Sequence, residues 1–137
     1  MTGVADGFAV REVAGGTLVA RRVNTAMGFW ARFRGLMGRD GLAPDEGLFL
    51  PDSSIHMFFM RFPIDALFVS RAGPDGTRRV VGLRRQLPPW RGIVLPVRGA
   101  QGVVELPSGT LQGKGVQLGD EVVFEAAAAE QPEVSRT

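Results

Sequence analysis

The chain contains no cysteine and no tyrosine, and it has a single histidine, His56, and a single lysine, Lys114. Without thiols it cannot form disulfides, thiolate nucleophiles, zinc ribbons or iron–sulfur clusters. The side chains left for holding a metal are imidazole, carboxylate and thioether. Acid–base chemistry by a histidine near neutral pH would depend on His56 alone.

Long apolar runs are also absent. The longest stretch without a charged residue, Val23 to Ala31, is far shorter than the ~20 apolar residues that cross a bilayer, and Asp6 lies where a signal peptide would carry basic residues. We therefore expect a soluble cytoplasmic protein with no membrane span. With 137 residues, 45% of them hydrophobic, the chain is long enough for one domain with an ordinary core. We assign residues 1–125 to that domain and expect residues 126–137 to form a disordered tail.

Few groups in this chain titrate between neutral and strongly alkaline pH. The formal net charge is only +2, whereas the pI is about 10.3, because every basic residue but one is an arginine. The pI therefore overstates how basic the protein is. The distribution of charge is more informative, since six arginines and no acidic residue lie between Asp75 and Glu105. They are Arg78, Arg79, Arg84, Arg85, Arg91 and Arg98, and we call residues 78–98 the basic segment.

The sequence predicts two β-hairpins, each made of two runs of β-forming residues around a turn that contains glycine. The first joins Phe8–Val13 to Thr17–Val23, and the second joins Ile64–Ser70 to Arg78–Leu83. Further strands are predicted at Gly47–Leu50, Ile55–Met60, Gly102–Leu106 and Glu121–Glu125, with an irregular proline-rich connection from Leu87 to Pro96.

Two short helices are predicted among these strands. Thr25 is placed to cap a helix whose apolar residues recur three and four apart as far as Met37. Ser108 is placed to cap a helix of one or two turns that ends near Gly113 to Gly115. The strands are joined by local hairpins, without the strand–helix alternation of a parallel sheet. The predicted fold is therefore α+β and mainly β, a compact antiparallel barrel-like or bent sheet with two short helices.

The stretch from Ser53 to Ser70 places His56, Arg61 and Asp65 within an apolar segment, where polar groups must be paired or useful. Its sequence Met60-Arg61-Phe62-Pro63-Ile64-Asp65 combines with Arg32-Phe33-Arg34-Gly35-Leu36-Met37-Gly38-Arg39 and Leu118-Gly119-Asp120. In these motifs the chain resembles uncharacterised protein family 0127, whose domain is domain of unknown function 192. The resemblance implies a relationship over most of the chain, and it supplies no catalytic residues.

His56 has two interpretations. On a strand from Ile55 to Met60 it would share one face with Phe58 and Met60. It is then either a structural histidine that bonds a backbone carbonyl or carboxylate, or a general acid, general base or metal ligand. In a catalytic site, Asp65 or Glu105 would orient its imidazole.

Other charged residues also have a structural and a functional interpretation. Asp65 begins a strand after a proline, where a carboxylate commonly accepts backbone N–H groups, and Arg61 is spaced to pair with it. Arg34 and Arg39 lie near the end of the first predicted helix, where they would complement its negative pole. Alternatively, their guanidinium groups would clamp a carboxylate or phosphate.

No cofactor or metal is predicted. The stretch from Ser108 to Gly115 lacks the first glycine and the final hydroxyl residue of a phosphate-binding loop. The acidic residues between Asp40 and Asp52 do not have the spacing of a calcium loop. Met37, Met57 and Met60 could join His56 as ligands of Cu(I), but methionines beside phenylalanines are typical of core packing.

Charge segregation and the shortage of nucleophiles favour a small non-catalytic binding or accessory module for an anionic small molecule or an acidic protein partner. No catalytic residue is assigned. The alternative is a small enzyme that uses His56 as acid or base on an anionic substrate. Nucleic-acid binding is disfavoured because the chain lacks a dense stripe of basic and aromatic residues. The expected ligand-binding residues are Arg34, Arg39, His56, Arg61, Asp65, Arg84, Arg85 and Glu105.

Overall fold

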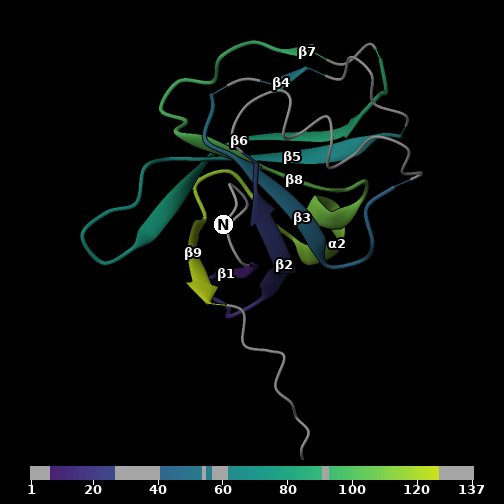
Figure 1. The fold of residues 1–137 in the computed structure, drawn as a ribbon. Helices are drawn as coiled ribbons and strands as arrows, with labels where there is room; N and C mark the ends of the chain where they lie inside the picture. The colour runs from purple at the N-terminus through teal and green to yellow at the C-terminus, as the bar shows by residue number, and fades with distance from the viewer. Residues whose placement is uncertain (1–6, 27–40, 54, 57–61, 91–92, 127–137) are drawn as a thin grey trace, which may run out of the picture.

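Seven strands form a closed barrel in the computed structural model, which describes residues 7–26, 41–53, 55–56, 62–90 and 93–126 (Figure 1). The predicted α+β and mainly β fold with a barrel-like sheet is confirmed, and so are both predicted hairpins. Strand β9 pairs with β1 to close the barrel. In order around it, the strands are β1 (Phe8–Glu12), β2 (Leu18–Thr25), β3 (Glu46–Leu50), β8 (Gly102–Pro107), β5 (Ile64–Val69), β6 (Thr77–Leu87) and β9 (Glu121–Ala126).

One neighbouring pair in the barrel, β2 and β3, is parallel, with Val23 opposite Gly47. The sequence predicted an antiparallel sheet, so this parallel pair was not predicted. A parallel pair needs a crossover connection of about a dozen residues or more, and the chain between Thr25 and Glu46 is long enough to provide one. Parallel pairing depends on where such a connection runs, so no local turn sequence predicts it.

Strand β5 is buried on both of its faces, which explains why every residue in it except Asp65 is apolar. Leu67 and Val69 face the interior of the barrel together with Val104 of β8. Ala66 and Phe68 alternate with them and belong to a second cluster on the outer face of the sheet. A further layer of chain therefore covers the outside of β5.

That layer includes the short strands β4 (Ile55–His56) and β7 (Ile93–Val94), which form an antiparallel pair of their own. The pair lies beyond β5 and β6, at the top of Figure 1, and Val94 packs in the outer cluster with Phe68. Strand β4 contains the first two residues of the strand predicted at Ile55–Met60, and the remainder lies outside the described residues. Strand β7 was not predicted, because the neighbouring prolines favoured an irregular connection.

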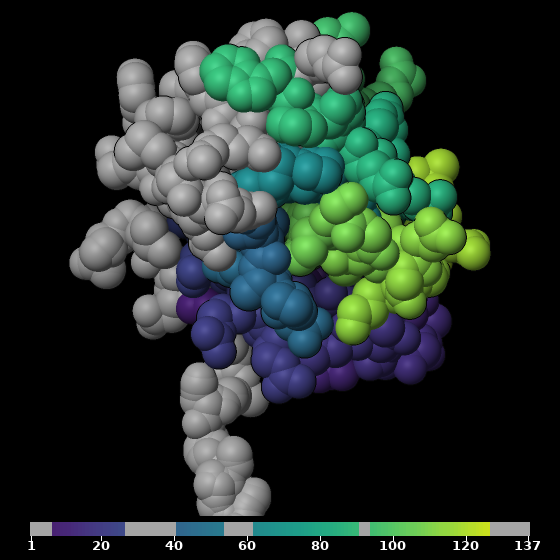
Figure 2. All heavy atoms as spheres, turned by 90° about the vertical axis from the view of Figure 1, so that its right-hand side faces the viewer, coloured from purple at the N-terminus to yellow at the C-terminus, as the bar shows by residue number. Residues whose placement is uncertain are grey.

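The short helix α2 (Thr110–Lys114) contacts β2, β5, β6 and β8. Its Leu111 is fully buried in the apolar cluster inside the barrel, together with Leu67 and Val104. Figure 2 views the molecule from the side on which the light-green α2 lies, between the teal β5 and the purple β2. The helix ends where the sequence predicted. The prediction that Ser108 caps it was wrong, because the cap residue is Gly109, whose left-handed φ of 94° suits glycine, with no side-chain cap.

The first predicted helix falls mostly on undescribed residues. Its predicted cap, Thr25, is the last residue of β2, and Ala26 donates its backbone N–H to the Phe49 carbonyl at 2.8 Å. Residues 27–40 lie outside the described residues, so this helix stays a prediction.

The turn predicted between β5 and β6 is held by Asp75. Its carboxylate accepts the backbone N–H of Thr77 at 3.1 Å and the Thr77 hydroxyl at 2.8 Å. These bonds hold the pKa of Asp75 below its ordinary value. Because the folded-state pKa is lowered, this local contribution to stability is present at neutral pH and is lost as the pH falls through the folded-state pKa.

Near the end of β5, three phenylalanines pack together, and an arginine lies over two of their rings. The ring of Phe124 stacks on Phe8 with centroids 4.8 Å apart and meets Phe49 edge-on at 5.2 Å. The Arg78 guanidinium lies 4.5 Å from the Phe124 centroid and 5.5 Å from that of Phe49, and its Nη1 donates to the Ser70 carbonyl at 3.1 Å. Burial lowers the pKa of Arg78. This arginine therefore belongs to the packing of the barrel rather than to a free basic surface.

Replacing Arg78 with alanine should lower the free energy of unfolding by about 1–2 kcal/mol, because the cation–π contacts and the bond to the carbonyl are both lost. Arg78→Lys should recover only part of this, since an ammonium group cannot stack as a plane. Urea denaturation measures the change. The exposed neighbour Arg79 is the control, and Arg79→Ala should shift the free energy by less than about 0.5 kcal/mol. Equal losses at the two positions would contradict the packing role of Arg78.

Candidate functional site

A groove lies between the outer face of β6 and the segment that begins at β7. Its volume is about 530 Å³, within the range of roughly 300–1,000 Å³ that is usual for small-molecule sites. We call it the arginine groove because two arginines, one from each side, lie among its lining residues. The described residues that line it are Val81, Arg84, Val94, Leu95, Pro96, Val97 and Arg98.

A glycine in β6 lets the second wall of the groove approach the sheet. A Cβ added to Gly82 would lie 3.0 Å from Cγ1 of Val97 and 3.3 Å from Cβ of Phe68, so a side chain here would force its neighbours apart. Backbone hydrogen bonds also hold this wall. The Val97 N–H donates to the Ser53 carbonyl at 2.8 Å, and the Val97 carbonyl accepts the N–H of Ala100 at 3.0 Å. The shape of the groove is therefore set by the fold itself.

Arg84 projects from the outer face of the barrel. It lies opposite Ala66 of β5, and opposed residues of an antiparallel pair point to the same side, here the side of the outer cluster. The side chain is exposed, and its Nη1 donates to the Leu83 carbonyl at 2.8 Å. Arg98 is also exposed, and among the described residues no hydrogen bond or ion pair involves its side chain. Both guanidinium groups thus keep donors for a ligand.

No residue of the described lining is acidic, so the positive charge of the two arginines is not neutralised within that lining. The sequence supports the same conclusion, because residues 53–64 and 76–104 contain no aspartate or glutamate. All lining residues other than the two arginines are apolar. The groove therefore combines two cations with aliphatic side chains.

A buried carboxylate occupies the same row of the sheet as Arg84. Glu105 of β8 is fully buried and lies opposite Ala66, which in turn lies opposite Arg84. Three adjacent strands thus place these residues side by side on the outer face. Strands are about 4.8 Å apart, so the backbones of Glu105 and Arg84 are separated by roughly 10 Å. Glu105 belongs to the covered part of this face and is not among the lining residues of the groove.

Asp65 lies on the opposite face of β5, towards the barrel interior. Its fully buried carboxylate accepts three backbone N–H groups, from Gln86 at 2.8 Å, Gly109 at 3.1 Å and Leu111 at 2.9 Å. These contacts are the backbone bracing that was one of the two interpretations of Asp65 from the sequence. These three hydrogen bonds connect β5 to β6 and to the first turn of α2, which Ser108 was expected to cap.

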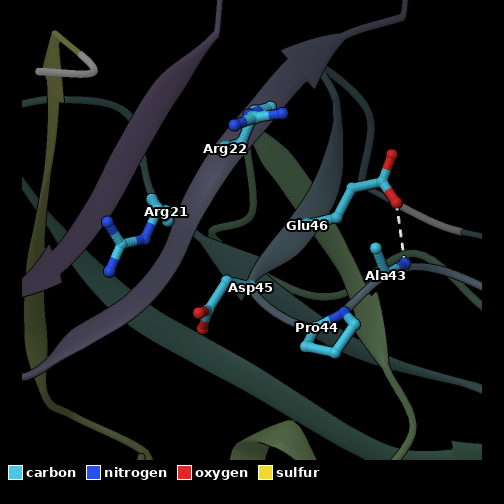
Figure 3. Close-up of a pocket in the computed structure, with 6 residues that line it drawn as sticks. All are labelled: Arg21, Arg22, Ala43, Pro44, Asp45 and Glu46. Carbon is cyan, nitrogen blue, oxygen red and sulfur yellow. Dashed lines mark hydrogen bonds between the residues drawn. The ribbon is translucent and has the colours of Figure 1, made fainter. Parts of the chain in front are cut away.

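A second hollow, of about 370 Å³, lies between β2 and the segment before β3 (Figure 3). The Asp45 carbonyl accepts the backbone N–H groups of Arg21 and Arg22 at 2.8 and 3.0 Å, and its carboxylate lies 3.7 Å from Lys114 Nζ. The Glu46 carboxylate accepts the Ala43 N–H at 2.7 Å. Arginines and carboxylates are balanced here, so the hollow has little net preference for an anion. Its described lining residues are Arg21, Arg22, Ala43, Pro44, Asp45 and Glu46.

The family model of DUF192, described as uncharacterized ACR, matches residues 10–124. This range begins within β1 and ends within β9, so it spans the barrel. The chain belongs to the DUF192 family. The resemblance indicated by the motifs around Met37, Asp65 and Gly119 is thereby confirmed.

Two curated relatives carry the name UPF0127 protein. The one from Thermococcus sibiricus is 38% identical over 109 residues, which cover 76% of this chain and 66% of the relative. The one from Thermococcus kodakarensis is 35% identical over 104 residues, covering 72% of this chain and 62% of the relative. This DUF192 chain therefore spans just under two thirds of the length of these relatives.

Solved structures share the fold. A protein of Sinorhizobium meliloti, provisionally described as a transcription regulator, has a TM-score of 0.73 at 24% identity, covering 90% of this chain and 97% of that one. A protein of unknown function from Novosphingobium aromaticivorans has a TM-score of 0.64 at 25% identity, covering 85% and 82%. These likenesses show a shared fold and no function.

The fold separates the site residues that the sequence predicted. Arg84 lines the arginine groove, whereas Arg85 is exposed on the same strand and is not among the described lining residues. Asp65 and Glu105 lie on opposite faces of the sheet, so they do not form one site. For His56 the structure describes the backbone, which pairs with that of Ile93.

The remaining predicted arginines, Arg34, Arg39 and Arg61, lie outside the described residues. Arg98 and the aliphatic lining of the groove were not among the ligand-binding residues predicted from the sequence. Arg98 was part of the basic segment, but its position opposite Arg84 depends on a contact between Val97 and Gly82 that sequence spacing does not reveal.

Within the described ranges, no three histidine, aspartate or glutamate residues gather in a way that could hold a metal. The same part of this DUF192 chain contains no helix with the length and apolar character needed to cross a membrane.

Proposed function

We propose that this protein is a non-catalytic binding or accessory module that holds an anionic ligand, or an acidic group of a partner, in the arginine groove. The observation that carries the proposal is that Arg84 and Arg98 both line a hollow of about 530 Å³ with no acidic residue in its described lining. Guanidinium groups present paired N–H donors that match carboxylate and phosphate oxygens. An anion entering this groove would gain two charged partners.

The alternative, an enzyme that uses His56 as acid or base, has less support among the described residues. Asp65, one of the two carboxylates expected to orient the imidazole, faces the barrel interior and already accepts three backbone N–H groups. The strand that carries His56 belongs to the layer over the outer face of β5, so of the two carboxylates only Glu105 lies on the same side of the sheet. We therefore favour binding over catalysis.

Citrate, an anion without an apolar part, is a suitable first probe for the groove. In a titration followed by amide NMR signals at low ionic strength, we expect shifts at Val97 and Arg98. Combining Arg84→Ala with Arg98→Ala should weaken binding by about tenfold or more, as expected for the loss of at least one charged hydrogen bond. Binding should also weaken as salt is added, because the guanidinium groups are exposed.

Arg85→Ala is the matched control, since Arg85 is an exposed arginine next to Arg84 and does not line the described groove. It should reduce citrate affinity much less than Arg84→Ala does. If the two single substitutions weaken citrate binding equally, the protein attracts anions only through its general charge. If citrate shifts no groove amide, the groove is not the anion site.

A further inference from the structure

The two arginines of the groove have aliphatic neighbours, which a site for a bare inorganic anion would not require. Apart from its two arginines, the described lining consists of valines, a leucine and a proline. Leu95 stands out, because 75% of its surface is exposed although it is a large apolar side chain. An inorganic phosphate bound by the arginines would leave this apolar surface in water.

We infer that the ligand is a small organic acid, whose carboxylate is bound by Arg84 and Arg98 and whose apolar part packs on Leu95 and the neighbouring valines. This inference rests on the proposed function and adds the chemical class of the ligand. Burying apolar surface is favourable in proportion to the area removed from water. A ligand with an apolar part would therefore bind more tightly by covering Leu95, whereas an inorganic anion would not.

The construction of the groove supports a preformed site for such a molecule. Val94 is 5% exposed and is anchored in the outer cluster, so the strand before Leu95 is fixed. On the other side of Leu95, the backbone of Val97 is bonded to Ser53 and Ala100. A wall that is ordered before binding reduces the entropy that a ligand would otherwise lose in ordering it.

The test is a series of straight-chain carboxylates of equal charge: acetate, butyrate and hexanoate. Affinities come from the NMR shifts of the groove amides, at a fixed ionic strength and pH. We expect the affinity to rise with chain length, by up to about fourfold for each methylene that becomes buried. Hexanamide has a similar apolar chain without the charge, and it should bind much more weakly than hexanoate.

Leu95→Ser tests the wall directly. Because Leu95 is exposed, this substitution should leave the melting temperature nearly unchanged. It should reduce the affinity for hexanoate by a larger factor than the affinity for acetate, so the dependence on chain length becomes shallower. Arg85→Ala, outside the described lining, should leave that dependence as it is.

The two proposals fail in different ways. If acetate and hexanoate bind equally and both depend on Arg84, the groove binds anions but the inference about an apolar ligand is overturned. If hexanoate and hexanamide bind equally and neither responds to Arg84→Ala, anion recognition itself is wrong. If the chain-length dependence is unchanged in Leu95→Ser, the apolar part of the ligand does not pack on this wall, and the inference is overturned.

Discussion

Replacing Asp65 with alanine is expected to lower the free energy of unfolding by about 3 kcal/mol or more. The Asp65 carboxylate is fully buried and accepts the backbone N–H groups of Gln86, Gly109 and Leu111. A buried donor that loses its acceptor costs about 1–3 kcal/mol. Here the buried N–H of Leu111 and the partly buried N–H groups of Gln86 and Gly109 would lose theirs at once. The loss should be large although no apolar core side chain is removed.

Urea denaturation followed by circular dichroism measures this change. Asp65→Asn should cost less than Asp65→Ala, because the amide keeps one oxygen that can accept some of the same bonds. Asp75→Ala is a matched control, since its carboxylate also accepts backbone and hydroxyl donors but lies in an exposed turn. It should cost much less than Asp65→Ala, because substitutions at exposed turn positions change stability little. An Asp65→Ala protein as stable as the Asp75→Ala protein would show that these three bonds do not stabilise the fold.

Asp65 also illustrates what the sequence could predict and what it could not. Its position after Pro63 at the start of a strand indicated a carboxylate that accepts backbone N–H groups. The partners of that carboxylate are 21, 44 and 46 residues away along the chain, and no local pattern specifies them. Ser108 was expected to cap α2 because the cap was sought nearby, whereas Asp65 supplies the acceptor from another strand. Hairpins, in contrast, depend on neighbouring residues, and both were predicted.

The basic segment shows the same limit on a larger scale. Arg78 and Arg84 are six residues apart, and in a regular strand they would share a face. The pairing of β5 with β6 skips Val81, since Phe68 lies opposite Gly82 and Val69 opposite Val80. This bulge reverses the alternation, so Arg78 packs against Phe124 while Arg84 lines the outer groove. Arg78 and Arg84, which belong to one basic segment in the sequence, therefore lie on opposite faces of β6.

Because Phe68 lies beneath the arginine groove, we expect its removal to affect both stability and binding. Phe68 is fully buried in the outer cluster, and it is close to Gly82, over which Val97 packs. Phe68→Ala should lower the free energy of unfolding by about 3–5 kcal/mol, the usual cost of a phenylalanine-sized cavity in a core. Phe68→Leu keeps most of the apolar volume and should cost about 1–1.5 kcal/mol.

The binding result separates a local cavity from a general loss of stability. Measured under conditions in which the variant stays folded, Phe68→Ala should weaken citrate binding, because the wall that carries Val97 loses its support. Arg78→Ala also lowers stability but acts on the inner aromatic cluster, so it should leave citrate binding nearly unchanged. If Phe68→Ala binds citrate as tightly as the unmodified protein, the groove does not depend on the packing beneath it. In that case Arg84 alone, extending from a rigid β6, would account for anion binding, and the contact between Gly82 and Val97 would serve only the fold.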